Sequence, residues 1–501
     1  MKLTVNGNIN RYYAETLCLI YFPGEKFPDD EAARAAESTV CEFSVHDTPD
    51  GAAASVTLTA DGRTASSEKT CSTSELALAD ADKCAKIAAG RALQCAATEL
   101  TGYIPPWGIL TGVRPARVAS ALLDSGKTPA ECAAYLTSVY GASDDKSSLA
   151  VSVAESERRF ILPDENGRCS IYIAIPFCPT KCRYCSFVSV ASPRLFSLIP
   201  EYLDALCLDI TAVADTVREL GLAVASIYVG GGTPAILTES QIDRLLAHVR
   251  REFGDNAAEL DFEAGRPDVI SDEKMRILRA NGVNRVSVNT QTLNLQILEN
   301  IGRSHTPEQF FRAFDAARAA GIPQINVDLI AGLPGESADS FADSLGRVAA
   351  LCPENVTVHT FTVKKSSEFK EEGVFSRENT DAGISVSRAQ KMLCAEGYAP
   401  YYMYRQKNTV ANLENTGYAL PGCEGLYNIY MMEEVHTVFG VGASSVTRMT
   451  LTDKASGKQE IERIFEMKYP YEYLKDHAGD VGRERRDLMR SRAVEFYKNH
   501  G

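Results

Sequence analysis

The sequence has 501 residues, more than one hydrophobic core usually organises, so two or three domains are expected. Hydrophobic residues make up 45% and charged residues 24%, the ordinary composition of a soluble globular protein. The net charge is −14 and no dense block of Lys and Arg occurs, which argues against a nucleic-acid partner. The N-terminal segment MKLTVNGNIN lacks the pattern of a signal peptide, and no apolar run approaches the roughly 18 residues of a membrane span. We therefore expect a cytoplasmic protein without a transmembrane segment.

Residues 1–165 are predicted to form an N-terminal α+β domain. Val56 and Leu58 alternate with polar residues ahead of the dipeptide Asp61-Gly62, which is typical of hairpin turns, so residues 52–67 are predicted to form a β-hairpin. Residues 74–100 are rich in Ala and Leu at helical spacing, and helices are expected to continue to about residue 160. The polar segment LPDENGR, residues 162–168, is predicted to be a linker.

Residues 166–368 are predicted to form an α/β core, because short β-rich runs alternate there with amphipathic helical runs. Strands that are separated by helices pair in parallel, so the expected fold class is α/β, a partial (β/α)6 barrel. In such a barrel the ligand site lies at the carboxyl ends of the strands, where the unusual residues of this segment also fall. Residues 369–501 are predicted to form a C-terminal accessory region. The strands are expected at 171–175, 226–229, 260–263, 285–288, 325–329 and 356–361.

The stretch CPTKCRYC places Cys178, Cys182 and Cys185 at the spacing Cx3Cx2C, directly after the first of these strands. The chain has 14 cysteines, and the scattered ones are predicted to be small buried apolar residues in a reducing compartment. A structural zinc ion takes four ligands, so three thiols would need a distant His or Cys. A cubane iron–sulfur cluster takes one Cys per iron, so three thiols leave one iron open to a small molecule. The spacing alone leaves both sites open.

The residues around this motif carry a family resemblance. The three cysteines, with Tyr184 before the last, resemble the signature of the radical S-adenosylmethionine (SAM) enzymes, which favours a [4Fe–4S] cluster over zinc. The segments IYIAIPFC, YVGGGTP, EAGRPD, NRVSVNTQT, IGRSHT and VDLIAGLPGE, in this order, are similar to the oxygen-independent coproporphyrinogen III oxidase group. LTGVRP (110–115), residues 401–422 and YNIYMMEE (427–434) resemble the HemZ-type coproporphyrinogen dehydrogenases. The resemblance implies a [4Fe–4S] cluster and SAM as cofactors.

The resemblance also implies roles for single side chains. The three cysteines would hold the cluster and leave its fourth iron to SAM. Simpler explanations stay open: a tight turn for the glycines, a surface ion pair for Arg303, and a helix-cap or turn role for Asp328. His305 is expected to be a loop histidine and Trp107 a core residue, while the role of Arg114 is open. The SAM contacts are expected from Tyr172, Gly231, Gly232, Thr233, Glu263, Gln291, Arg303 and Asp328.

The implied reaction is the oxygen-independent oxidative decarboxylation of coproporphyrinogen III to protoporphyrinogen IX, in haem biosynthesis. The implied partners are a tetrapyrrole substrate, which is negatively charged, and an electron donor protein. Cationic side chains near the site would bind the carboxylates of the substrate. The candidates are Lys364, Lys365, Arg405 and Lys407.

Three positions depart from the oxidase pattern. Phe187 stands where the oxidases carry a fourth cysteine, Ala174 stands where many relatives have His, and GVGASS (440–445) lacks a histidine of the family. These departures leave the SAM site intact and keep two alternatives open: a haem chaperone with the same cofactors, and a radical SAM enzyme that acts on another tetrapyrrole. A tRNA-modifying enzyme is less consistent with the acidic charge.

Overall fold

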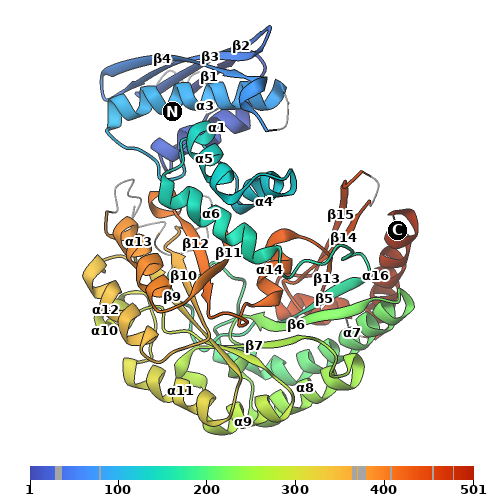
Figure 1. Ribbon diagram of the computed structural model, residues 1–501. Coiled ribbons are helices and arrows are strands. Elements are labelled where there is room, and N and C mark those ends of the chain that lie inside the picture. The colour runs from blue at the N-terminus through green and yellow to red at the C-terminus, as the bar shows by residue number, and fades with distance from the viewer. Residues whose placement is uncertain are drawn as a thin grey trace.

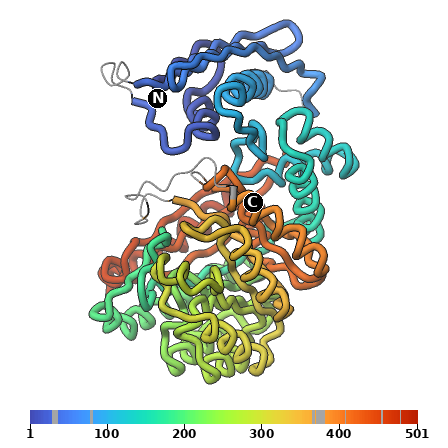
Figure 2. Tube along the Cα trace, turned by 90° about the vertical axis from the view of Figure 1, so that its left-hand side faces the viewer, coloured from blue at the N-terminus to red at the C-terminus, as the bar shows by residue number. Residues whose placement is uncertain are grey.

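The computed structural model describes residues 1–28, 37–77, 81–363, 369, 380–406, 409–453, 456–477 and 479–500. Within these residues the strands form two sheets, one with four strands in the order β1-β2-β3-β4 and one with eleven. Figure 1 shows the small sheet and its helices above the large, strongly curved sheet, and Figure 2 shows the same stacking after a 90° turn. In the described part of the chain, no helix is long and apolar enough to cross a membrane.

The N-terminal part is a mixed four-stranded sheet that packs on helices: β1 pairs in parallel with β2, whereas β2, β3 and β4 pair antiparallel. Asp61 and Gly62 have φ values of 50° and 72°, as the two-residue turn between β3 and β4 requires, so the predicted hairpin is confirmed. Helix α3 begins at Ala81, after a separate capped turn at Thr73–Glu75. The bounds are β1 (Lys2–Asn6), α1 (Arg11–Tyr21), β2 (Val40–Thr48), β3 (Gly51–Ala60), β4 (Arg63–Ser72), α3 (Ala81–Thr101), α4 (Ala116–Asp124), α5 (Pro129–Tyr140) and α6 (Asp144–Glu157).

The centre of the large sheet is the predicted partial (β/α)6 barrel. Strands β5 to β10 lie side by side in sequence order, and each pairs with the next in parallel. All six predicted strands are found, and the helices between them cover the outer face (Figure 1). The bounds are β5 (Arg168–Ile175), α7 (Ile199–Glu219), β6 (Ala223–Gly231), α8 (Glu239–Phe253), β7 (Glu259–Gly265), α9 (Asp272–Ala280), β8 (Arg285–Val288), α10 (Leu295–Asn300), α11 (Pro307–Ala319), β9 (Gln324–Ala331), α12 (Ala338–Ala349) and β10 (Asn355–Thr360).

The C-terminal part extends this sheet at both edges. Strand β12 pairs antiparallel with β10, and β11 pairs with β12, whereas β13 pairs in parallel with β5 and leads to β14 and β15. The division into three domains stays a prediction, because residues 369–501 share a sheet with the barrel. The bounds are α13 (Thr380–Ala395), β11 (Ala399–Arg405), β12 (Glu414–Ala419), α14 (Leu426–Glu433), β13 (Thr437–Val441), β14 (Val446–Thr452), β15 (Gln459–Phe465), α15 (Pro470–His477) and α16 (Gly479–His500).

The inner face of the barrel is polar, while the outer face holds the hydrophobic core. Paired residues in a sheet point to the same side, and one such row contains Tyr172, Tyr228, Asp261 and Arg285. The neighbouring position Ile171 is buried in the core with the apolar stripes of the covering helices. The fold therefore directs polar side chains toward the barrel axis, where a polar ligand can be held.

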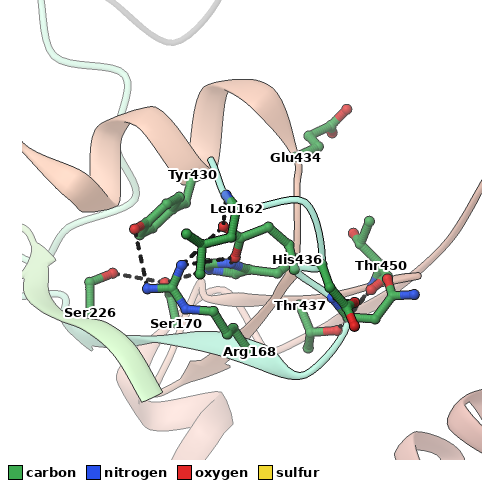
Figure 3. A network of polar contacts seen from close by, with 12 residues as sticks. Leu162, Arg168, Ser170, Ser226, Tyr430, Glu434, His436, Thr437 and Thr450 are labelled. Atoms are coloured by element: carbon green, nitrogen blue, oxygen red, sulfur yellow. Dashed lines mark hydrogen bonds and ion pairs between the residues drawn. The ribbon is translucent and has the colours of Figure 1, made fainter. Parts of the chain in front are cut away.

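The expected linker, residues 162–168, is fastened by a buried polar network (Figure 3). Glu165 accepts a hydrogen bond from the Leu162 backbone N–H at 2.8 Å and lies 2.9 Å from Nδ1 of His436. Burial lowers the pKa of His436, so its neutral ring donates from Nδ1 to Glu165 and accepts from the Ser170 hydroxyl at Nε2, at 2.8 Å. Ser170 also contacts Ser226 at 2.7 Å. The network joins the linker to β5, β6 and the segment before β13.

Candidate active site

The cysteine motif lies in the loop that follows β5. The backbone N–H of Cys178 donates to the carbonyl of Val190 at 3.0 Å, and the N–H of Cys185 donates to the carbonyl of Cys182 at 3.0 Å, so the loop is folded back on itself. Cys178 and Cys182 are buried and Cys185 is half-buried. Burial raises the pKa of the Cys178 thiol and raises that of Cys185 to about 11. A bound cation would favour the thiolate forms of these residues.

The glycine run at the end of β6 lies against the cysteine loop. The Gly232 N–H donates to Ile175 and the Thr233 N–H donates to Phe177, at 2.9 and 2.8 Å. A Cβ atom on Gly232 would lie 2.5 Å from the Phe177 carbonyl oxygen and 2.9 Å from Cys178 Sγ. The hydroxyl of Thr233 donates to the same sulfur at 3.5 Å. Glycine is therefore required at 232 for this close approach of the two loops.

Two carboxylates from different strands face the same space. Burial, together with the negative charges of Asp328 and Asp261, raises the pKa of Glu263 to about 8. Burial also disfavours the charged form of Asp328, but hydrogen bonds from His359 and Asn326 lower its pKa. The Nε2 atom of His359 lies 3.6 Å from Asp328 Oδ2, and Asn326 Nδ2 lies 2.7 Å from Oδ1. At neutral pH the pair thus presents one protonated and one charged carboxyl group.

Gln291 and Arg303 complete the polar wall. Gln291 has a φ of 71°, and its N–H donates to the Asp328 carbonyl at 2.9 Å, so the strained backbone is held against β9. Its Oε1 atom is buried and has no hydrogen-bond partner among the described residues. Arg303 is buried, donates from Nη1 to the Asn289 carbonyl at 2.6 Å, and leaves Nε without a partner in the described part of the chain. The wall therefore holds one acceptor and one donor that a bound ligand can satisfy.

These residues line one cavity of about 200 Å³ at the carboxyl ends of the strands. Every residue expected from the sequence to bind the cluster or SAM lines it, except Tyr172. The Tyr172 ring stacks instead on Tyr228 and Tyr427, with centroid distances of 6.0 and 6.2 Å. The contact of Tyr172 with a cofactor stays a prediction.

The other candidate residues do not line the cysteine cavity or lie outside the described residues. Trp107 is fully buried, as expected of a core residue, and His305 is buried in a loop beside Thr290. Arg114 donates to the Met432 carbonyl and pairs with Glu434, so it joins the N-terminal part to α14. Arg405 lies outside the cysteine cavity, in a second one. Lys364, Lys365 and Lys407 lie outside the described residues.

The sequence reasoning missed several residues of the cavity wall. His359 and Tyr404 line it from β10 and β11, and Asn289 and Arg266 line it from the ends of β8 and β7. Arg266 is held by a bidentate pair with Asp268. His359 lies near the carboxyl end of the sixth predicted strand, so the rule that strand ends carry the site could have found it. Tyr404 had no such signal, because the place of β11 depends on distant pairing.

The residues present fit an iron–sulfur cluster and SAM. In the described part of the chain, no three His, Cys, Asp or Glu side chains are close enough to hold a single metal ion. A cubane takes one thiolate per iron, so its sulfur ligands need not converge on one point. The close approach at Gly232 and the unpartnered Gln291 Oε1 leave a polar cradle beside the cysteine loop.

Comparisons with known proteins gave a match to one family model and to several relatives. Residues 172–348 match the family model of the Radical SAM superfamily. Over 367 residues the chain is 38% identical to the oxygen-independent coproporphyrinogen-III oxidase-like protein HemZ of Bacillus subtilis, covering 72% of each chain. It is 30% identical to the heme chaperone HemW of the same species, over 60% of this chain and 77% of that one. The solved structure of coproporphyrinogen III oxidase (HemN) from Escherichia coli matches with a TM-score of 0.49 and 24% identity, over 64% of this chain and 71% of that one.

Members of the radical SAM superfamily bind a [4Fe–4S] cluster and SAM, and these are the cofactors of this chain. This assignment agrees with the cysteine loop and the six-stranded core of the chain, and with its similarity to HemZ along most of its length. The chain belongs to the radical SAM superfamily and, within it, to the HemZ-type family of oxygen-independent coproporphyrinogen-III oxidase-like proteins.

Proposed function

We propose that this protein decarboxylates two propionate groups of coproporphyrinogen III and yields protoporphyrinogen IX without oxygen. The observation that carries the proposal is the single cavity in which the three cysteines, the glycine run and the carboxylates of β7 and β9 meet. The name of the HemZ relative supports the substrate, since it describes that protein as coproporphyrinogen-III oxidase-like. The proposed partners are the tetrapyrrole and an electron donor protein, with no role for nucleic acid.

Cys178, Cys182 and Cys185 would hold three irons as thiolates, and the fourth iron would be open to SAM. When bound, the reduced cluster and SAM would supply a 5′-deoxyadenosyl radical able to take a hydrogen atom from the propionate β-carbon. The bond from the α-carbon to the carboxylate would then break, carbon dioxide would leave and a vinyl group would form, with the released electron passing to a one-electron redox protein, which the proposal requires besides the electron donor. Cys178 and Cys182 are buried and Cys185 is half-buried, so the protein would shield two of the three cluster ligands from solvent.

The other side chains would bind and orient SAM. The protonated carboxyl of Glu263 can donate a hydrogen bond, and the charged carboxylate of Asp328 can accept bonds from ribose hydroxyls. The buried Arg303 has a free Nε donor for a carboxylate, and the free Oε1 of Gln291 accepts from an ammonium or hydroxyl group. These assignments follow the chemistry of each group and are part of the proposal.

A haem chaperone is the second candidate, and one observation favours it. Phe187, at the position of the fourth cysteine of the oxidases, is 67% exposed and lines the mouth of the cysteine cavity. A phenyl ring cannot replace a cysteine as a ligand to iron, but an exposed ring can stack on the flat face of a macrocycle. The similarity to the heme chaperone HemW covers 60% of this chain, whereas the similarity to HemZ covers 72%.

The test is an anaerobic turnover experiment. The cluster is reconstituted, its iron is measured, and SAM, a reductant and coproporphyrinogen III are added before products are identified by mass. We expect the loss of two carbon dioxide units, abolished in Cys182→Ala and retained in Cys95→Ala, which changes an exposed cysteine on α3. SAM cleavage without change in coproporphyrinogen would refute the proposal, and stable haem binding by the same preparation would then support the chaperone.

A further inference from the structure

A second cavity, of about 70 Å³, lies between the N-terminal part and the end of β11 with the segment that follows it. Its walls come from α1 and Pro23 after it, from residues 103–113, and from residues 405–406 and 409–412. The last two segments contain parts of three motifs singled out in the sequence: LTGVRP, YYMYRQKN and NLENTG. Figure 1 shows β11 and β12 on the side of the barrel that faces α6. Segments far apart in the chain thus build one cavity.

The walls of this cavity are mostly apolar. Leu19, Ile20 and Pro23 line one side, and Val113 lies at the rim, half exposed. The Tyr103 hydroxyl is turned to the wall, because it donates to the Ala411 carbonyl at 3.0 Å. A ligand of this cavity would therefore bury an apolar stem.

Arg405 is the charged group of the cavity, and it is 5% exposed. Its guanidinium donates to the carbonyls of Leu110 and Asn412 and lies 5.7 Å from the centre of the Trp107 ring. Among the described residues, no carboxylate forms an ion pair with it, and its Nε–H has no acceptor. Burial lowers the pKa of Arg405 to about 10, against the effect of the nearby Glu414.

Two features show that the missing partner is an acceptor. Glu414, the acid in the neighbourhood, is already bound by the Lys146 ammonium and by Trp107 Nε1, at 2.8 Å for the latter. The Nδ2 amide of Asn412, which also lines the cavity, is buried without a hydrogen-bond partner in the described residues. The Nε–H of Arg405 and the Nδ2 amide of Asn412 are thus two buried donors without acceptors, each of which costs free energy, and one carboxylate could accept from both.

We propose that this cavity is a binding site for a carboxylate on a short apolar stem, held by Arg405 and Asn412. Gln406 lines both this cavity and the cysteine cavity, so the two spaces adjoin at its side chain. The carboxylate is then a propionate of a tetrapyrrole that reaches past Gln406, or a separate small carboxylic acid. The assignment to a propionate rests on the proposed function, whereas the carboxylate site rests on the contacts alone.

The experiment uses Trp107, the only tryptophan of the chain, as a reporter beside the site. The full chain, with its cluster loaded but without SAM or reductant, is titrated with coproporphyrin III, with its tetramethyl ester and with butyrate. No turnover occurs under these conditions, so an absence of decarboxylation leaves the result unaffected. We expect coproporphyrin III to quench the Trp107 emission and the ester to bind at least tenfold more weakly.

Asn412→Asp is the decisive variant. Asn412 has a φ of 55°, which Asp tolerates as Asn does, so the variant keeps the backbone and adds a negative charge beside Arg405. Hydrogen bonds to charged groups contribute about 1.5–3 kcal/mol, so the affinity for a carboxylate should fall by about 10- to 150-fold. Asn256→Asp adds the same charge on an exposed loop and should leave the affinity unchanged.

Each result decides between support and refutation. Butyrate binding that is lost in Asn412→Asp supports the site and identifies a separate small acid as a sufficient ligand. Binding of coproporphyrin III alone, also lost in Asn412→Asp, supports the site and assigns it to a propionate. Arg405→Gln should weaken both, provided that its thermal melt shows a folded protein. Equal binding of acid and ester, affinity unchanged in Asn412→Asp, or no binding at all would overturn the proposal.

Discussion

Replacing Gly232 by Ala should separate the two loops that enclose the cluster. The added Cβ would lie 2.5 Å from the Phe177 carbonyl oxygen, whereas carbon–oxygen contacts settle at about 3.3 Å. The loops must therefore move apart by about 0.8 Å. Overpacking of this kind costs about 1–3 kcal/mol. Because the clash lies at the backbone beside Cys178, most of that cost should fall on the form that holds the cluster.

A cost of about 1–3 kcal/mol corresponds to about 5- to 150-fold weaker retention of the cluster. The assay is iron content after anaerobic reconstitution and challenge with a chelator, together with SAM affinity by equilibrium dialysis. Gly383→Ala, in α13, is the matched control, because a Cβ there meets no atom within 4 Å. Full iron retention and SAM affinity within about twofold of wild type in Gly232→Ala would refute the reasoning.

Three further variants test the charges of the fold. The pKa of Glu263 in the folded state is raised to about 8, so the folded, cofactor-free protein loses stability as this carboxyl group becomes charged at rising pH. Glu263→Gln should therefore be more stable than wild type at pH 9 and equally stable at pH 4, where the carboxyl group is mostly neutral in the folded and in the unfolded state. Burial opposes the charge of His477, but Asp209 and Glu466 raise its pKa to about 9. His477→Gln should therefore lose about 3 kcal/mol in urea melts at pH 6, where the stabilisation is fully present, and less as pH rises through 9. Glu165→Ala leaves the donors of Leu162 and His436 unpaired, so it should cost about 1–3 kcal/mol with iron content unchanged.

The results that would contradict these three expectations differ. For Glu263→Gln it is a stability advantage that does not grow with pH in thermal melts. For His477→Gln it is a loss of equal size at pH 6 and pH 10, since the His477 charge is gone at the higher value. For Glu165→Ala it is a parallel loss of iron, which would mean that the linker network acts on the cysteine loop and not on the fold alone.

The sequence predicted the barrel because its signals are local. Each strand is a short apolar run with the next helix directly behind it, and parallel pairing through crossovers then sets the order β5 to β10. The Asp61-Gly62 turn is local in the same way. The places of β12 beside β10 and of β13 beside β5 depend on pairing across tens or hundreds of residues, which no local pattern encodes.

The residues of the candidate site likewise fall into those that local sequence signals predict and those that depend on distant strand pairing. The cysteines and the glycines follow predicted strands and Glu263 ends one, so their meeting at one end of the barrel could be anticipated. Tyr172 also lies on a predicted strand, but its place in the register opposite Tyr228 directs its ring into an aromatic stack. The wall formed by Tyr404 could not be anticipated, because it depends on where β11 joins the sheet.

Strand β11 gives the N-terminal part a structural link to the cysteine cavity. Side chains alternate along a strand, so Tyr402 and Tyr404 point to one face and Met403 and Arg405 to the other. Tyr404 lines the cysteine cavity, whereas Met403 is buried in the N-terminal hydrophobic core and Arg405 lies over Trp107. One strand is thus a shared wall between two chemically different spaces. Met403 and Arg405 anchor that wall to residues 1–165. A carboxylate bound at Arg405 would therefore lie one residue along the strand from Tyr404, which lines the cysteine cavity.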